Sequence, residues 1–332
     1  MVAMALIGAG RIGQLHAGNL AGNSKVELVA IADVVAPAAE ALAAQHGTRA
    51  RSVDAVIADD GIDAVLIASS TDTHADLIEQ AARAGKAIFC EKPIDLDTAR
   101  ARQAVTVAEE CGVALAIGFN RRFDSHFASL KARIEAGEIG ELETVSIISR
   151  DPSPPALDYL ATSGGLFRDM MIHDFDMARW LTGEDVVELH AMSANLIDPA
   201  IGEVGDVDTA IVMMRMTSGR LCQITTSRRA AYGYDQRIEC HGSLGMARAE
   251  NVTLSTVEVA RADGFRRDPA EPFFLERYDA AYKAELAHFV ECIQAGKPAG
   301  PTGSDGIAAL ELADAAAHSA DTGKLIRLAA PG

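Results

Sequence analysis

The stretch "VAMALIGAGRIGQLHAGNL", which runs from Val2 to Leu20, decides how the first part of the chain folds. An apolar run leads into Gly8, Gly10 and Gly13, and a helical pattern follows the glycines. In a strand–turn–helix unit the first glycine permits the tight turn, the second lets the backbone approach an anion, and the third lets helix and strand pack closely. The free N–H groups at the start of such a helix attract a phosphate. We therefore expect a strand, a glycine turn that can hold a phosphate, and a helix.

The alternation of strand and helix patterns continues to about residue 118. Four more short apolar runs follow the first, "VELVAIAD", "DAVLIAS", "KAIFCEK" and "VALAIGF", and helical patterns separate them. Strands that are apolar almost throughout are typical of a parallel sheet covered by helices on both faces. Residues 1–119 are therefore predicted to form a Rossmann-type, doubly wound parallel sheet in an α/β protein.

The pattern changes after Phe119. A helix is expected at about 124–137 and a strand at about 141–149, followed by a proline-containing loop and another helix. Later runs have β-character without helices between them, which indicates a large open, mostly antiparallel sheet. Two helices, at about 275–294 and 304–322, close the chain. We expect residues 120–332 to form an α+β domain for substrate binding and oligomerisation, whose last helices can pack back on the first domain. The later runs are "VVELHAMSANLI", "DTAIVMMRMT", "GRLCQITTSRRA", "DQRIECHG" and "VTLSTVEVA".

Asp33 identifies the ligand that the glycine turn is expected to hold. It ends the second apolar run, 20 residues after Gly13, where a carboxylate can accept hydrogen bonds from a ribose 2′-hydroxyl. The same carboxylate repels a 2′-phosphate, and Val34 and Val35 supply no arginine to hold one. The sequence thus favours NAD over NADP. The alternative is a glycine turn without a ligand, in which Asp33 caps the loop.

Polar residues also follow two other apolar runs, at the carboxyl ends of strands, where doubly wound sheets bind ligands. In "SSTDTHADL" the alternative is a helix cap, with Thr73 capping and His74 in the first turn. In "CEKPID" Pro93 restricts the backbone of Lys92, whose ammonium can move a proton or stabilise an alkoxide, or can simply end the strand at the surface. The candidate cofactor contacts are Gly8, Gly10, Arg11, Ile12, Gly13, Asp33, Ser70, Thr71, His74, Glu91 and Lys92.

The segment "FRDMMIHDFDMARW", Phe167 to Trp180, places Asp169, His173 and Asp176 at positions i, i+4 and i+7. On one helix these residues share a face. Three interpretations are open: a metal site, an acid/base site, or a structural role in the core or as caps. A divalent ion would be repelled if Lys92 enters the same site, so we expect no metal there, and the residues alone leave the acid/base and structural interpretations open.

Taken together, "GAGRIG", Asp33, "EKP" and "DMMIHDFDMARW" resemble the Gfo/Idh/MocA oxidoreductases, over essentially the whole chain. The resemblance implies that Lys92, Asp169 and His173 are the catalytic set and face a nicotinamide. His173 would be the base that takes the proton of an alcohol, Asp169 would orient its ring, and Lys92 would bind the reacting oxygen. This chain departs from many relatives in reading "STDTH" where they carry Thr-Pro, and in its long proline-rich loop.

Three segments are similar to the branch of that family that oxidises inositol: "GFNRRFD", "SGGLFRDMMIHDFDMARW" and "SRRAAYGYDQRIE". The similarity implies oxidation of myo-inositol at C2 to the 2-keto product with formation of NADH, by a homotetramer. Two alternatives remain: a dehydrogenase for another inositol isomer or a pyranose, and a protein that senses NAD and a sugar without turnover. The resemblance implies substrate contacts from Asn120, Arg121, Asp151, Asp176 and Tyr234.

Charge and composition exclude several kinds of partner. The 332 residues include 30 Lys and Arg against 47 Asp and Glu, a formal net charge of −17, and no basic block occurs. Nucleic acid and anionic membranes are therefore not expected as partners, whereas a small polyol is. The five cysteines are scattered without a C-x-x-C pair, which is typical of reduced thiols in a cytoplasmic protein. The run "AIVMMRM" suggests a sheet face buried against a partner subunit.

Overall fold

A computed structural model describes residues 1–328 and divides the chain into two compact units. The first unit comprises Met1–Asn120 and Tyr282–Leu310, and the second comprises Arg121–Ala281 and the described residues from Glu311 to 328. The sequence analysis placed all of residues 120–332 in a second domain, with the prediction that its last helices can pack on the first domain. In the structure, the segment Tyr282–Leu310 belongs to the first unit.

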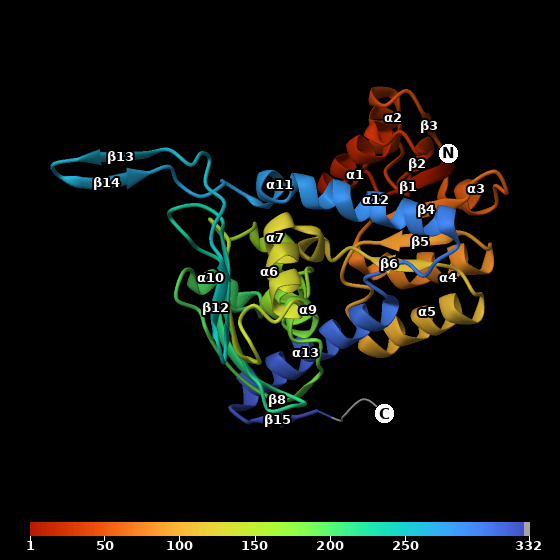
Figure 1. The fold of residues 1–332 in the computed structure, drawn as a ribbon. Coiled ribbons are helices and arrows are strands. Elements are labelled where there is room, and N and C mark those ends of the chain that lie inside the picture. The colour runs from red at the N-terminus through yellow and green to blue at the C-terminus, as the bar shows by residue number, and fades with distance from the viewer. Residues whose placement is uncertain (329–332) are drawn as a thin grey trace. The chain divides into compact units, whose positions relative to one another are not determined.

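The first unit contains a six-stranded sheet in the order β3-β2-β1-β4-β5-β6, and every neighbouring pair is parallel (Figure 1). This confirms the doubly wound sheet. The strand order reverses between β1 and β4, which is where sheets of this kind bind ligands. The strands are β1 (Val2–Ile7), β2 (Val26–Ala32), β3 (Arg49–Ala50), β4 (Ala64–Ile67), β5 (Ala87–Cys90) and β6 (Leu115–Ile117). The helices between them are α1 (Arg11–Gly22), α2 (Ala36–Gln45), α3 (Val53–Ile57), η1 (Thr71–Thr73), α4 (His74–Arg83) and α5 (Thr98–Glu110).

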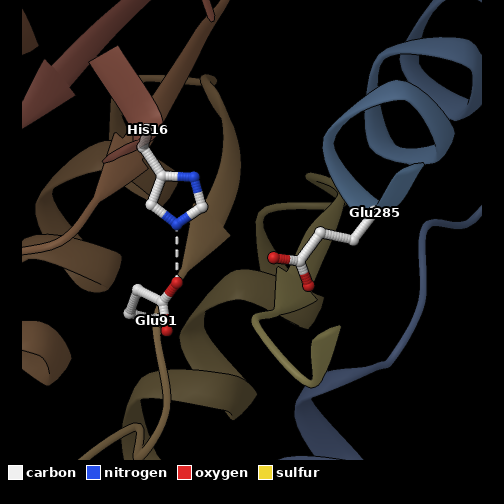
Figure 2. A group of neighbouring side chains, drawn as sticks. All are labelled: His16, Glu91 and Glu285. Atoms are coloured by element: carbon white, nitrogen blue, oxygen red, sulfur yellow. Dashed lines mark hydrogen bonds and ion pairs between the residues drawn. The ribbon is translucent and has the colours of Figure 1, made fainter. Parts of the chain in front are cut away.

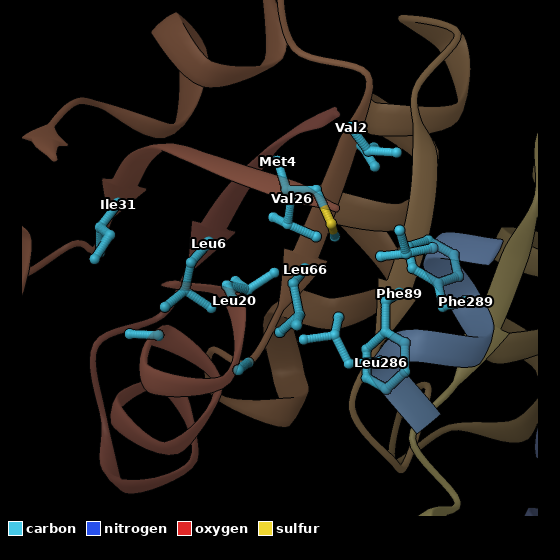
Figure 3. Packing of buried hydrophobic residues seen from close by; sticks show 14 of the residues in the cluster. Val2, Met4, Leu6, Leu20, Val26, Ile31, Leu66, Phe89, Leu286 and Phe289 are labelled. Atoms are coloured by element: carbon cyan, nitrogen blue, oxygen red, sulfur yellow. The ribbon is translucent and has the colours of Figure 1, made fainter. Parts of the chain in front are cut away.

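Helix α12 (Asp279–Ala295) returns to complete the core of the first unit. Its residues Leu286, Phe289 and Val290 are buried in the same cluster as Leu66 and Phe89 of the sheet, as Figure 3 shows for the labelled residues. The rings of Phe89 and Phe289 meet edge to face, with centroids 5.6 Å apart. Burying each such side chain contributes roughly 1.5–3 kcal/mol, which explains why this segment joins the first unit.

The second unit is built on a seven-stranded sheet in the order β12-β11-β7-β10-β9-β8-β15. Only the β7–β10 pair is parallel among these neighbours within residues 1–328, which confirms a mostly antiparallel sheet. The strands are β7 (Leu142–Arg150), β8 (Val186–Ala194), β9 (Thr209–Met216), β10 (Leu221–Ser227), β11 (Asp235–Gly242), β12 (Gly245–Ala249) and β15 (Ile326–Arg327). A separate hairpin joins β13 (Glu258–Arg261) and β14 (Gly264–Arg267).

One face of this second sheet is exposed in the single chain and carries apolar side chains on β9. Along β9, Val212 and Met214 are buried, whereas Ile211 and Met213 on the opposite face are 48% and 57% exposed. Helix α9 packs against β7 of the sheet. The other helices of this unit are η2 (Asn120–Phe123), α6 (Ser125–Glu135), α7 (Leu157–Leu160), α8 (Gly165–Asp169), α9 (Ile172–Thr182), α10 (Pro199–Glu203), α11 (Phe274–Arg277) and, in its later part, α13 (Gly303–Thr322).

One expected strand is largely absent. The run "VTLSTVEVA" was predicted as a strand, but only its end, from Glu258, is extended in β13, and β12 lies before it. The hydroxyl of Thr253 donates to the carbonyl of Ser255 at 2.6 Å, and the hydroxyl of Ser255 accepts the N–H of Val257 at 3.1 Å. Such local side-chain hydrogen bonds compete with a strand ladder.

All five cysteines are free thiols. Among residues 1–328, every helix is too short or too polar to cross a membrane.

Candidate active site

The glycine turn between β1 and α1 has the geometry of an anion site. Gly8 has a φ of +111°, and a Cβ there would lie 2.3 Å from the carbonyl oxygen of Ala68. A Cβ on Gly13 would lie 2.1 Å from the carbonyl oxygen of Gly8, so both positions require glycine. Gly10 is the N-cap of α1 and makes no side-chain cap bond, and nothing lies within 4 Å of where its Cβ would be. The first N–H groups of the helix, including those of Arg11 and Ile12, therefore fit a pyrophosphate.

Asp33 lies beside this turn, at the end of β2. Its Oδ2 accepts the N–H of Ala9 at 2.7 Å and its Oδ1 accepts the N–H of Val35 at 2.8 Å. The capping role that the sequence left open is therefore present. Each carboxylate oxygen of Asp33 keeps a second lone pair that can accept a hydrogen bond from a ribose hydroxyl. Asp33 can therefore cap the loop and bind a ribose at the same time. Val34 is 92% exposed, and a valine there offers no cation to a 2′-phosphate.

The loop after β4 differs from the expectation at His74. Both ring nitrogens of this buried histidine lie at backbone carbonyls, Nδ1 at 2.8 Å from Pro93 and Nε2 at 3.1 Å from Ser69. Burial lowers the pKa of His74. A neutral ring donates to one carbonyl at a time and connects the two loops, so it does not offer a nitrogen to a cofactor. Ser70 and Thr71 lie at the start of η1, where the hydroxyl of Thr73 donates to the carbonyl of Ser70 at 2.7 Å.

Lys92 directly follows Glu91 at the carboxyl end of β5 and is half-buried. The peptide bond between Lys92 and Pro93 is cis. The lysine thus lies at the carboxyl edge of the parallel sheet, where the sequence analysis placed it and where sheets of this kind bind ligands.

Behind this edge lies a buried group of one imidazole and two carboxyls, His16, Glu91 and Glu285 (Figure 2). His16 Nε2 lies 2.6 Å from Glu91 Oε1, and the ring meets Phe89 and Tyr282 edge-on. This distance is shorter than the roughly 3.3 Å between two ligands of a tetrahedral zinc ion, so the two groups are bonded to each other.

Glu285 of α12 completes this buried group. In the described part of the chain neither of its carboxyl oxygens has a hydrogen-bond partner, although the side chain is 1% exposed. Burial, with a smaller contribution from the charge of Glu91, holds the pKa of Glu285 well above its ordinary value. The geometry is that of a hydrogen-bonded pair, His16 and Glu91, beside a buried carboxyl group that has no hydrogen-bond partner in the described residues.

In the second unit, the predicted single helix through Asp169, His173 and Asp176 is broken. Helix α8 ends at Asp169 and α9 begins at Ile172, because the backbone turns at Met170 and Met171. The N–H of Met170 and that of Met171 both bond to the carbonyl of Leu166, which interrupts the regular i to i+4 series. The expectation of one shared helical face is therefore wrong, although Asp169 and His173 still flank the same turn.

Two arginines pair with acids of α9. Arg122 bonds Asp176 with two N–H groups, at 2.8 Å to Oδ2 and 2.5 Å to Oδ1, and Asp176 is 1% exposed. Arg121 pairs with the fully buried Asp174, a residue that the sequence analysis passed over. Arg121 and Asp176 were predicted to bind substrate hydroxyls, but these buried pairs give both of them a structural partner.

Asp151 follows β7, and its N–H donates to the carbonyl of Ser227 at 3.0 Å. Burial, more than its neighbours, raises the pKa of Asp151 to about 7; Asp169 and Asp174 add to the rise, and Arg228 and Arg121 oppose it. Asp169 accepts a hydrogen bond from the hydroxyl of Tyr159 at 2.9 Å, and its Oδ2 lies 3.8 Å from Nη1 of Arg228. Asp151 and Asp169 are therefore two carboxyls next to one buried arginine.

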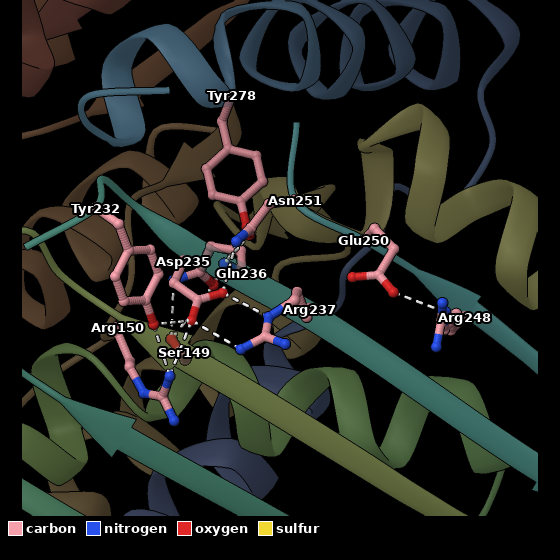
Figure 4. Close-up of polar contacts among 10 residues, drawn as sticks. All are labelled: Ser149, Arg150, Tyr232, Asp235, Gln236, Arg237, Arg248, Glu250, Asn251 and Tyr278. Carbon is pink, nitrogen blue, oxygen red and sulfur yellow. Dashed lines mark hydrogen bonds and ion pairs between the residues drawn. The ribbon is translucent and has the colours of Figure 1, made fainter. Parts of the chain in front are cut away.

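Tyr234 is buried in an aromatic group, with its ring edge-on to Phe273 and Tyr278. The neighbouring Asp235 fixes this end of β11 (Figure 4). Its carboxylate accepts hydrogen bonds from Arg150 at 3.0 Å, Tyr232 at 2.6 Å and Asn251 at 2.7 Å, and from Arg237. Burial alone would raise the pKa of Asp235, but these donors outweigh it and hold the pKa below its ordinary value. Tyr234 is thus fixed by its aromatic neighbours and by the hydrogen bonds of the adjacent Asp235.

The structure gathers only part of the predicted set in each unit. The cofactor candidates cluster at the carboxyl edge of the first sheet, and Asn120, buried at 2% exposure, ends the first of the two stretches that form that unit. In the second unit Asp151 and Asp169 share a polar cluster with Arg228, and Asp176 pairs with Arg122. Glu285, Asp174 and Arg228 were missed, because each lies in an ordinary helical or strand pattern and gains its partners only through folding.

Comparisons with known proteins identify the family of the chain and match its fold. The family described as "Oxidoreductase family, NAD-binding Rossmann fold" matches residues 2–119, and the "GFO/IDH/MocA C-terminal domain" matches residues 127–248. An inositol 2-dehydrogenase of Rhizobium meliloti is 52% identical over 99% of both chains. A myo-inositol dehydrogenase of Corynebacterium glutamicum has a similar structure, with a TM-score of 0.95, 47% identity and full coverage of both chains. A scyllo-inositol dehydrogenase of Lactobacillus casei, solved with NAD(H) and scyllo-inositol, has a TM-score of 0.92 at 30% identity and covers 98% of this chain and 99% of that one.

Proposed function

Since the chain belongs to the Gfo/Idh/MocA oxidoreductase family, we propose that it is an NAD-dependent dehydrogenase that oxidises myo-inositol at C2 to the 2-keto product. The proposal that inositol is the substrate rests on the 52% identity, over 99% of the chain, to an inositol 2-dehydrogenase. The retained Lys92 and His173 support an enzyme over a protein that only senses NAD and a sugar.

The site for the cofactor fits NAD. The uncapped start of α1 offers backbone N–H groups to the pyrophosphate, and Asp33 keeps lone pairs for the ribose hydroxyls. When bound, NAD⁺ supplies the hydride acceptor. The carbon of the substrate carbinol loses a hydride and its hydroxyl loses a proton, so the protein must take up that proton.

We assign the proton to the imidazole of His173, because imidazole is the side chain that most often serves as a general base near neutral pH. Lys92 binds the reacting oxygen through its ammonium and favours the alkoxide. Asp169, held by Tyr159, stabilises the imidazolium that forms. A positioned base contributes roughly 10²–10⁴-fold to the rate.

The variant His173→Ala tests this assignment. We expect its kcat for myo-inositol to fall by about 10²–10⁴-fold while the Kd for NADH, measured by fluorescence, stays near wild type. His318→Ala is the matched control, because His318 is exposed on α13. Turnover of His173→Ala within about twofold of wild type would remove this residue from the mechanism.

The inositol isomer needs its own test, since the Lactobacillus casei relative was solved with scyllo-inositol. NADH formation should be measured at 340 nm with myo-, scyllo- and chiro-inositol and with glucose. The highest kcat/KM with myo-inositol supports the proposal, and a higher value with scyllo-inositol or glucose selects that substrate instead.

We further propose a homotetramer in the cytoplasm. The exposed apolar side chains of the second sheet support assembly, because exposed apolar patches often mark interaction surfaces. Met192 is 69% exposed on β8 and lies opposite Ile211 of β9, so these side chains extend across both strands. Light scattering coupled to gel filtration should give four times the mass of one chain, and Met213→Lys should reduce that mass.

A further inference from the structure

Arg228 is a fully buried arginine with no role assigned above. It follows β10, whose last residue, Ser227, pairs with Arg150 of the parallel strand β7. The chain therefore places Arg228 next to Asp151, the residue after Arg150. The N–H of Arg228 donates to the carbonyl of Asp208 at 2.8 Å, which fixes its backbone.

The guanidinium of Arg228 reaches both ends of the short helix α8. Its Nη2 donates to Oδ2 of Asp206 at 3.1 Å, and Oδ1 of Asp206 accepts the N–H of Leu166 in the first turn of α8 at 2.8 Å. Its Nη1 lies 3.8 Å from Oδ2 of Asp169, the last residue of α8. One cation thus spans the element that carries the proposed catalytic carboxylate.

The hydrogen bonding of Arg228 is incomplete. Within residues 1–328, its Nε and Nη1 atoms are buried and have no hydrogen-bond partner. A buried donor without a partner costs about 1–3 kcal/mol, so a purely structural arginine would be expected to satisfy these groups. The distance of 3.8 Å to Asp169 exceeds the usual hydrogen-bond limit of about 3.2 Å by less than an ångström. A small shift of Asp169 therefore completes the contact.

We infer that Arg228 is a positioning residue for Asp169, which it holds in place so that this carboxylate can stabilise the imidazolium of His173. The inference rests on the proposed function, in which Asp169 acts on His173. Arg228 itself has no accessible N–H group with which to touch a substrate. Its effect on the reaction must therefore pass through Asp169.

A double-mutant cycle of Arg228→Lys with Asp169→Asn tests this coupling. Lysine keeps the charge but cannot reach Asp206 and Asp169 with separate N–H groups. We expect Arg228→Lys to lower kcat for myo-inositol by about 10–100-fold, with the KM for NAD⁺ unchanged. In the Asp169→Asn background the same change should lower kcat by less than about twofold, because the partner is already lost. Arg229→Lys is the matched control, since Arg229 is the exposed neighbour.

The outcomes separate the inference from the function it rests on. Asp169→Asn with wild-type kcat would refute the catalytic role of Asp169 and, with it, the inference. An impaired Asp169→Asn with an additive loss from Arg228→Lys would overturn the inference alone. The pH profile of kcat/KM is a second test. Arg228→Gln removes the positive charge, so the acid side of its profile should lie at higher pH than that of wild type. Arg228→Lys keeps the charge and should show little of this shift. If circular dichroism shows that Arg228→Gln is folded and the acid side of its pH profile is unchanged, the inference would also be overturned.

Discussion

Asp151→Asn should make the stability of the second unit less dependent on pH. The pKa of Asp151 is raised to about 7 in the folded chain, chiefly by burial, from an ordinary value of 3.8. Between these two values the folded chain holds a proton that the unfolded chain has released. Stability therefore falls as pH rises through this window. Asparagine has the same shape and remains neutral, so the variant avoids this loss.

The magnitude follows from the two pKa values. Each pKa unit corresponds to about 1.36 kcal/mol, so the full difference is at most about 4 kcal/mol. Between pH 5 and pH 8, the linkage relation gives a loss of about 2–3 kcal/mol for wild type relative to Asp151→Asn. As pH rises from 5 to 8, the difference in free energy of unfolding between the variant and wild type should therefore increase in favour of the variant. The average increase is close to 1 kcal/mol per pH unit.

Trp180 provides the assay. It is the only tryptophan and lies on α9 in the same unit as Asp151, so its fluorescence in urea follows the unfolding of that unit. The control is Asp321→Asn, an exposed aspartate of α13 in the same unit. Parallel stability curves for wild type and Asp151→Asn from pH 5 to pH 8 would refute the argument.

Three further changes test other parts of the structure. Asp33→Ala should narrow the ratio of kcat/KM between NAD⁺ and NADP⁺, because the carboxylate that repels a 2′-phosphate is gone; an unchanged ratio would count against that role. Glu285→Gln should be at least as stable as wild type at pH 8, and its advantage in Tm should shrink toward pH 5, because burial raises the pKa of Glu285; a lower Tm at pH 8 would contradict this. Gly13→Ala places a Cβ 2.1 Å from the carbonyl oxygen of Gly8 and should abolish NADH binding measured by fluorescence, whereas near-normal affinity would show that the turn tolerates it.

The local patterns were sufficient for the first sheet. The glycine turn and the apolar runs before residue 119 each correspond to a strand or turn of the structure, because a parallel strand buried on both faces leaves a strong signal in the sequence. The run "VTLSTVEVA" failed as a strand, since the side-chain hydrogen bonds of Thr253 and Ser255 are not visible in a hydrophobic pattern.

The site was harder to predict than the fold. A spacing of i, i+4 and i+7 suggested one helix through Asp169 and Asp176, but the carbonyl of Leu166 accepts two N–H groups and the helix breaks. The partners of Arg121 and Arg228 come from residues far along the chain, Asp174 and Asp206. Such pairings depend on how the strands of the sheet align, and the spacing of residues in the sequence does not show this alignment.

The division of the first unit between two distant stretches of chain has a consequence for biosynthesis. A ribosome releases Met1–Asn120 long before it adds Leu286 and Phe289, so the nascent sheet lacks part of its apolar cover while the middle of the protein is made. Truncation before residue 282 would leave the same surface bare, and such fragments should associate or be degraded. Expression of the dinucleotide-binding module in isolation would accordingly require Tyr282–Leu310 to be grafted onto residue 120 through a short linker.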